Sequence, residues 1–157
     1  MKKFVIPFIV VLGCFVIACN NSDKKHDHGT GDAPKNLADS LMKFIDDGHM
    51  VGMSKIGKLH NTQKEVQRVL DSLKKLPAKA QQAAEPYINQ LNAVIKDLEY
   101  ADFAMDKWMT EFDMDSALDK MEQRIRYLTD EKLKVSKMKE AILGSLQKAD
   151  SLLKAKL

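Results

Sequence analysis

Six side chains in the middle and later parts of the chain carry soft or aromatic groups that could bind a soft metal ion. They are His49, Met53, Met105, Trp108, Met109 and Met121. Thioether sulfur and imidazole nitrogen suit Cu(I) and Ag(I), and an indole face can add a cation–π contact. Because these residues are far apart in the sequence, they form one site only if the fold brings them together.

Other spacings offer weaker chemistry. The run His26-Asp27-His28 places two imidazoles in a polar segment with little to hold them in place. The spacing Asp46-x-x-His49 is similar to that of di-iron helical bundles, but a dinuclear site needs a second copy and further carboxylates. We interpret Asp113 and Asp115 as helix or turn caps. The sequence has no Gly-rich phosphate loop, zinc-protease motif or Gly-x-Ser-x-Gly turn, so we expect neither an enzyme nor a bound organic cofactor.

Residues 1–18 have the composition of an export signal. Met1-Lys2-Lys3 is a short positive segment, and the apolar run 4–18 follows it. A transmembrane helix needs about 20 apolar residues, so this run is short for a retained span. We therefore expect residues 1–18 to be removed.

The apolar run ends in Val16-Ile17-Ala18-Cys19, which resembles the lipobox of bacterial lipoproteins. The resemblance implies cleavage before Cys19 and a diacylglycerol on its sulfur. The protein would then be anchored to the outer membrane of the cell envelope, and the sequence does not indicate whether it faces the periplasm or the cell surface. Cleavage before Cys14 fits the same pattern but leaves a short apolar run. An ordinary secretory signal is the other alternative. With Cys14 removed and Cys19 alkylated, no thiol remains for a disulfide or a thiolate site.

The rest of the chain divides into a tether and one domain. Residues 19–35 are mostly Asn, Ser, Asp, Lys, His and Gly, which predicts a disordered segment because so little can be buried. Residues 36–157 have the length of a single domain. The 25 basic and 22 acidic residues nearly balance, which argues against a nucleic-acid partner. The expected contacts are the membrane, through the lipid, and other envelope proteins.

From Leu37 on, apolar residues recur at steps of three and four, which predicts an all-α antiparallel bundle of three long helices. The first stripe runs from Met42 to Leu73. In the second helix the expected core positions are 88, 91, 95, 98, 102, 105, 109 and 112. In the third they are 118, 121, 125, 128, 132, 135, 139, 142, 146, 149 and 153. Three stripes can cover one another within one chain, so a monomer is favoured over a homo-oligomer.

Breaker residues predict the helix boundaries. Leu76-Pro77 ends the first helix, and Asp113-Met114-Asp115-Ser116 separates the second from the third, with an aspartate or serine as N-cap. Pro86 either starts the second helix, which allows a fourth short helix before it, or kinks it.

Three glycines in the first helix need an explanation. Gly48, Gly52 and Gly57 cost about 1 kcal/mol each relative to alanine. Close approach of a neighbour such as Trp108 and local distortion near Gly48 are the two explanations.

Antiparallel packing predicts where the soft side chains meet. Folding the chain at Pro77 sets His49 opposite about position 106, and folding near Met114 brings Met121 level with residues 105–109. The six soft and aromatic residues would then form one layer. Methionine fills irregular cores well, so one hypothesis is a packed layer with His49 as its hydrogen-bonded polar member. The others are a Cu(I) or Ag(I) site, a small apolar ligand, or an inserted partner helix.

Two short elements resemble a known family. The first comprises His49, Met53, Lys55, Ile56, Gly57 and Leu59, and the second spans 101–109. They are similar to elements of small Bacteroidota lipoproteins labelled "viral A-type inclusion protein", over the chain from His49 to its end. The resemblance implies a lipid-anchored helical bundle and no established activity. Gly52 and Ser54 stand where relatives often have Val and Pro, and Ile56 where they have Met, so no role of that methionine carries over.

These observations together favour a non-enzymatic envelope lipoprotein that acts as a structural or interaction module. The alternative is a periplasmic protein that binds Cu(I) or Ag(I) through the His/Met/Trp layer.

Overall fold

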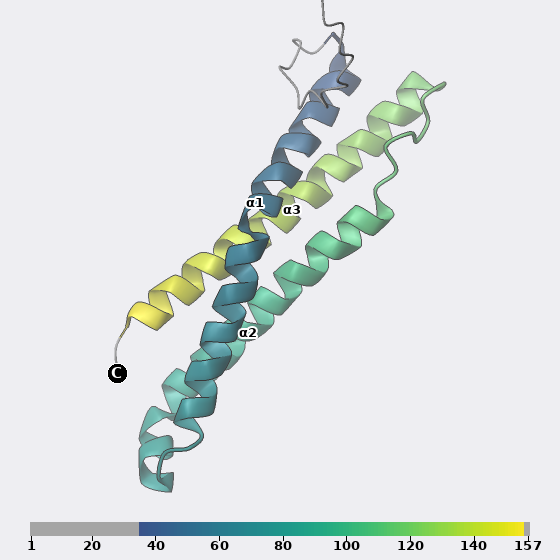
Figure 1. Ribbon diagram of the computed structural model, residues 1–157. Coiled ribbons are helices and arrows are strands. Elements are labelled where there is room, and N and C mark those ends of the chain that lie inside the picture. Colours follow the sequence, from purple (N-terminus) through teal and green to yellow (C-terminus); the bar gives the residue numbers. More distant parts are fainter. Residues whose placement is uncertain (1–34, 156–157) are drawn as a thin grey trace, which may run out of the picture. The chain divides into compact units, whose positions relative to one another are not determined.

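The computed structural model describes residues 35–155, which form a bundle of three α-helices (Figure 1). The helices are α1 (Leu37–Leu73), α2 (Ala78–Glu111) and α3 (Met121–Lys154). The described residues contain no strand, and the predicted all-α three-helix bundle is confirmed. The predicted signal segment, Cys19, His26-Asp27-His28 and nearly all of the predicted tether lie outside these residues. Of the described helices, none has an apolar stretch that could span a bilayer.

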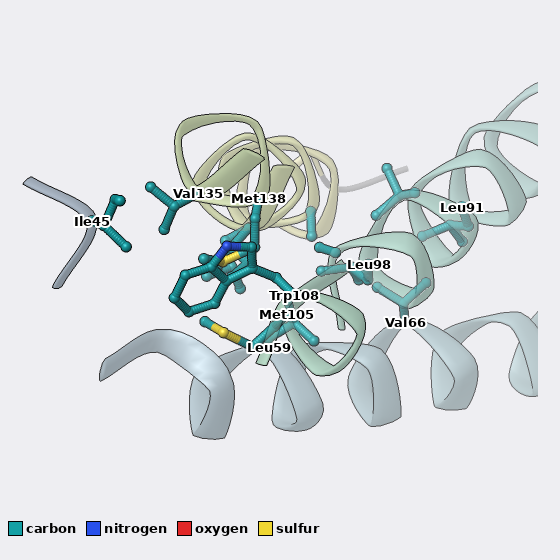
Figure 2. Packing of buried hydrophobic residues seen from close by; sticks show 14 of the residues in the cluster. Ile45, Leu59, Val66, Leu91, Leu98, Met105, Trp108, Val135 and Met138 are labelled. Atoms are coloured by element: carbon teal, nitrogen blue, oxygen red, sulfur yellow. The ribbon is translucent and has the colours of Figure 1, made fainter. Parts of the chain in front are cut away.

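Buried apolar side chains from all three helices form the core (Figure 2). The largest fully buried ones are Ile45, Leu59, Val66, Leu70, Leu91, Leu98, Met105, Leu128, Val135 and Ile142. Each such side chain stabilises the fold by about 1.5–3 kcal/mol through its removal from water. Burial at three-four spacing is therefore the main force that holds three helices of this length together.

Contacts between α1 and α2 show that the two helices are antiparallel. The ring of His49 lies beside that of Trp108, and further along α1 the Nε2 atom of His60 lies 2.8 Å from Asp102 Oδ1. Residues later in α1 thus face residues earlier in α2, as they do in an antiparallel pair. The prediction that the chain folds at Pro77 and sets His49 opposite about position 106 is close to the observed partner.

The α2–α3 pair is also antiparallel, but its register differs from the prediction. Trp108 donates a hydrogen bond to Glu131, and Tyr87 donates one to the Leu152 carbonyl. Residues slightly beyond 130, rather than Met121, therefore lie level with residues 105–109. The prediction for Met121 was wrong because α3 begins only at Met121, after a connection that spans 112–120.

That connection packs along the first turns of α3. The Arg124 guanidinium donates to the carbonyls of Met114 and Ser116, and the backbone N–H of Asp113 donates to the Tyr127 hydroxyl at 2.6 Å. The residue before α3 is Lys120, which makes no side-chain cap hydrogen bond. The predicted aspartate or serine N-cap of this helix is thus wrong.

The predicted break at Leu76-Pro77 is confirmed, since α1 ends at Leu73 and α2 begins directly after Pro77. Pro86 lies inside α2 and does not start it, so residues 78–85 are part of α2 and form no separate helix. A proline inside a helix removes one backbone hydrogen bond and bends the helix. The first turns of α2 run at an angle to the rest of that helix (Figure 1), as expected for the kink alternative.

Five of the predicted core positions of α2 and α3 are replaced by the residue that precedes them. On α2 the positions 91, 98 and 105 are buried as expected, but 94, 101 and 108 are buried in place of 95, 102 and 109. On α3 the buried positions 131 and 138 replace Lys132 and Lys139. Both Lys132 and Lys139 instead place their ammonium groups over the Phe44 ring, 4.7 and 5.8 Å from its centre. On α2 the predicted and the observed core positions share 91, 98 and 105, and the structure adopts the set that buries Trp108.

Candidate functional site

Four rings from the three helices and the α2–α3 connection follow one another at the end of the bundle where α1 begins. The centre of the His49 ring lies 5.2 Å from that of Trp108, the Trp108 ring stacks at 4.8 Å on Phe112, and Phe112 stacks at 6.2 Å on Tyr127. Aromatic pairs at such separations add about 0.5–1.5 kcal/mol beyond the area they bury. Phe112, the first residue of the α2–α3 connection, thus packs between the rings of Trp108 and Tyr127.

A buried carboxylate lies beside these rings. Glu131 is only 2% exposed, and it accepts hydrogen bonds from the Trp108 indole N–H at 3.0 Å and from Lys134 Nζ at 2.7 Å. A buried charge is tolerated when it is paired and hydrogen-bonded. The same hydrogen bond to Glu131 raises the pKa of Lys134, which keeps that ammonium charged.

The Tyr127 hydroxyl contacts the backbone of the α2–α3 connection at Asp113. Burial raises the pKa of Tyr127 above its usual value of 10.0, while the hydrogen bond from the Asp113 backbone acts in the opposite direction. The phenol therefore stays neutral at physiological pH and serves as a hydrogen-bond acceptor for the connection. Asp113 in turn accepts a hydrogen bond from the Asp115 backbone N–H at 3.0 Å, which agrees with the interpretation of Asp113 as a turn cap.

One nitrogen of His49 has no partner. Its Nε2 atom is buried and makes no hydrogen bond to any described residue. The expectation of a hydrogen-bonded core histidine is therefore wrong for this atom. An unpaired buried polar group costs about 1–3 kcal/mol, so this nitrogen is the unexplained polar atom of the site.

Gly52 lies one turn after His49, where α1 meets two methionines. A Cβ atom added at Gly52 would lie 2.5 Å from Met105 Cε, 3.2 Å from Met138 Sδ and 3.3 Å from Ile142 Cδ1. Close approach thus explains this glycine, and the bulky neighbour is Met105, not Trp108. At Gly57 nothing lies within 4 Å of such an atom, so close approach does not explain that position. Figure 2 shows Met105, Trp108 and Met138 gathered in the core.

The predicted soft residues divide into buried and exposed members. Met105 is 1% exposed, whereas Met53 and Met109 are 40% and 42% exposed. Met121 is 51% exposed and begins α3, away from the level of Met105. The expectation that Met109 and Met121 occupy core positions is wrong.

Two members of the site were missed from the sequence. Glu131 and Met138 both lie in the site, and both fit the three-four spacing with Val135 and Ile142. That spacing could have revealed Met138. Glu131 could not be expected as a core residue, because a glutamate is buried only when partners such as Trp108 and Lys134 are in reach.

Next to Trp108, a groove of about 340 Å³ opens between α2 and α3. Its apolar walls come from Tyr100, Phe103, Trp108 and Met138, and lysine side chains stand among its lining residues. Within residues 35–155, no three or more His, Cys, Asp or Glu side chains gather closely enough to hold a metal ion. A soft-metal site here would therefore depend on thioethers.

No protein-family model matches this chain, and neither the search of curated proteins nor that of solved structures found a similar one.

Proposed function

We propose that the chain is an envelope lipoprotein whose helical bundle serves as a non-enzymatic structural or interaction module. The observation that carries this proposal is the sequence Val16-Ile17-Ala18-Cys19 at the end of the apolar run 4–18. Acyl chains contribute about 0.8 kcal/mol per buried CH2 group. Several chains on Cys19 would hold the domain at the outer membrane while the bundle stays in water.

The start of the bundle supports the division into tether and domain. The Asn36 side chain accepts a hydrogen bond from the Asp39 backbone N–H at 3.0 Å and so caps α1. An asparagine in this position satisfies one of the free N–H groups at a helix start. The folded domain thus begins with a definite cap close to the end of the polar segment 19–35.

The state of the acidic and basic groups supports a structural role. Glu131 is held by Trp108 and Lys134, and Asp102 is held by His60. A general acid or base needs access to a substrate proton, whereas Glu131 is only 2% exposed and is held by its two partners. The three helices also bury their apolar stripes within one chain, which supports a monomer. We propose other envelope proteins as its partners.

Fractionation of cells that express the full chain tests this proposal. We expect the wild-type protein and a Cys14→Ser variant in the membrane fraction, released by detergent but not by high salt. A Cys19→Ser variant should lose this attachment, because it lacks the sulfur that accepts the lipid. Equal behaviour of the two cysteine variants would contradict the proposal. The resemblance to small Bacteroidota lipoproteins stays a prediction that the same experiment bears on.

A further inference from the structure

The unpaired Nε2 atom of His49 indicates a missing partner. Buried polar groups in folded proteins nearly always have one, and within the described residues this nitrogen has none. Neutral imidazole nitrogen is the commonest metal ligand in proteins. A metal ion bound to the nitrogen lone pair is therefore a partner that would compensate the buried Nε2 atom of His49.

The register of α1 against α2 supplies two further ligands. His60 and Asp102 face each other across the seam between these helices at 2.8 Å. Met53 lies one heptad before His60, and Met109 lies one heptad after Asp102. A heptad returns to the same helix face, so in an antiparallel pair Met53 and Met109 occupy the equivalent opposed positions.

His49 and Trp108 belong to the same part of the seam. His49 precedes Met53 by one helical turn, so the two side chains share a face of α1. Trp108 directly precedes Met109, and its ring lies 5.2 Å from that of His49. The indole ring therefore lies beside the imidazole that would hold the ion, where it can add a cation–π contact.

We propose that this seam binds one soft monovalent metal ion, Cu(I) or Ag(I), through His49 Nε2 and the sulfur atoms of Met53 and Met109. Imidazole and thioether ligands suit such ions. The half-exposed methionines are unbranched and adaptable, so their sulfurs can turn toward the buried nitrogen. Binding leaves the ion monovalent, so no oxidant or reductant is needed.

The remaining methionines of the layer have other roles. Met105 and Met138 are buried and pack against Gly52, and Met121 lies outside this level. Asp102, the carboxylate that faces α1 beside His60, is already paired, and the ligands proposed here are nitrogen and sulfur atoms. A soft ion is therefore favoured over a hard one that needs oxygen ligands.

Titration with Ag(I) tests the proposal directly, because Trp108 is the single tryptophan of the chain. The protein used begins at residue 19 with Cys19→Ser, which removes the remaining thiol. We expect saturable quenching of Trp108 fluorescence at one ion per chain. We also expect the thermal midpoint to rise with the concentration of ion above its Kd. Cu(I) under anaerobic conditions should give the same stoichiometry. Absence of saturable quenching with both ions would overturn the proposal.

Variants at exposed positions separate metal binding from folding. Met53→Leu/Met109→Leu should fold normally and bind Ag(I) at least tenfold more weakly. The matched control Met114→Leu/Met121→Leu changes two other exposed methionines and should bind as the parent does. His49→Phe keeps a ring against Trp108 but lacks the nitrogen, so it should also lose binding. Equal Ag(I) affinity of the two double variants would overturn the proposed ligand set, whatever His49→Phe does to the fold. Neither result depends on the lipid anchor.

Discussion

Replacement of Gly52 by alanine tests the close packing between α1 and the two buried methionines. The new methyl group would lie 2.5 Å from Met105 Cε, which must therefore shift, and 3.2 Å from Met138 Sδ, which must give by a few tenths of an ångström. Because Met105 is 1% exposed, its terminal methyl group has to shift within the packed core. Such overpacking costs about 1–3 kcal/mol, while alanine gains about 1 kcal/mol over glycine in a helix. We expect a net loss of about 1 kcal/mol in the free energy of unfolding.

Gly57 provides the matched control in the same helix. A methyl group there meets nothing within 4 Å, so Gly57→Ala should raise the free energy of unfolding by about 0.5–1 kcal/mol. The assay is urea unfolding followed by far-UV circular dichroism, with the midpoint and slope compared for both variants. The two substitutions should change the midpoint in opposite directions. Stabilisation by both, to the same extent, would refute the packing described around Gly52.

Two further predictions concern the rings and the buried carboxylate. A double-mutant cycle with Trp108→Phe and Glu131→Leu should give a coupling energy of about 0.5–3 kcal/mol in urea unfolding, because each change removes the same hydrogen bond; additive effects would argue against that bond. The pKa values of Tyr127 and Lys134 are both raised in the folded chain, so each contributes stability that is present below its unfolded pKa and is lost as the pH rises through its folded pKa. The free energy of unfolding should therefore fall above about pH 10, and it should fall less steeply in a Tyr127→Phe/Lys134→Gln variant than in wild type; equal slopes would contradict the assigned shifts.

Sequence periodicity predicted the helices well but not which of their faces meet. On α2, Leu91, Leu98 and Met105 belong to two overlapping three-four patterns, one through Met109 and one through Trp108. Counting apolar residues does not favour the first pattern, because it includes Asp102, whereas Val94, Ala101 and Trp108 of the second pattern are all apolar. The structure adopts the second, because Trp108 buries a large ring and its N–H finds Glu131.

The position of Met121 shows a second limit of the sequence. The residues 113–116 have the composition of a short turn, and Asp113 caps this turn, although the N-cap residue of α3 is Lys120. The length of the connection depends on contacts made after folding, those of Arg124 and Tyr127 with its backbone. Sequence spacing contains no sign of them, so the level of Met121 in the bundle could not be predicted.

The candidate site was partly foreseen for a physical reason. His49 was expected opposite the region of Trp108 because a single short turn at Pro77 joins the two helices. Such a short connection leaves little freedom in the register of α1 against α2. The unpaired state of His49 Nε2 and the burial of Glu131 arise from side-chain packing of three helices at once. No pattern along one helix contains that information.

Mass spectrometry of the N-terminal peptide from the membrane-bound protein tests the central proposal most directly. We predict that the mature chain begins at Cys19 and that this residue carries the added mass of a diacylglyceryl group, with or without a further acyl chain on its amine. A mature chain that begins at another residue, or an unmodified Cys19, would contradict the assignment of this protein as an envelope lipoprotein.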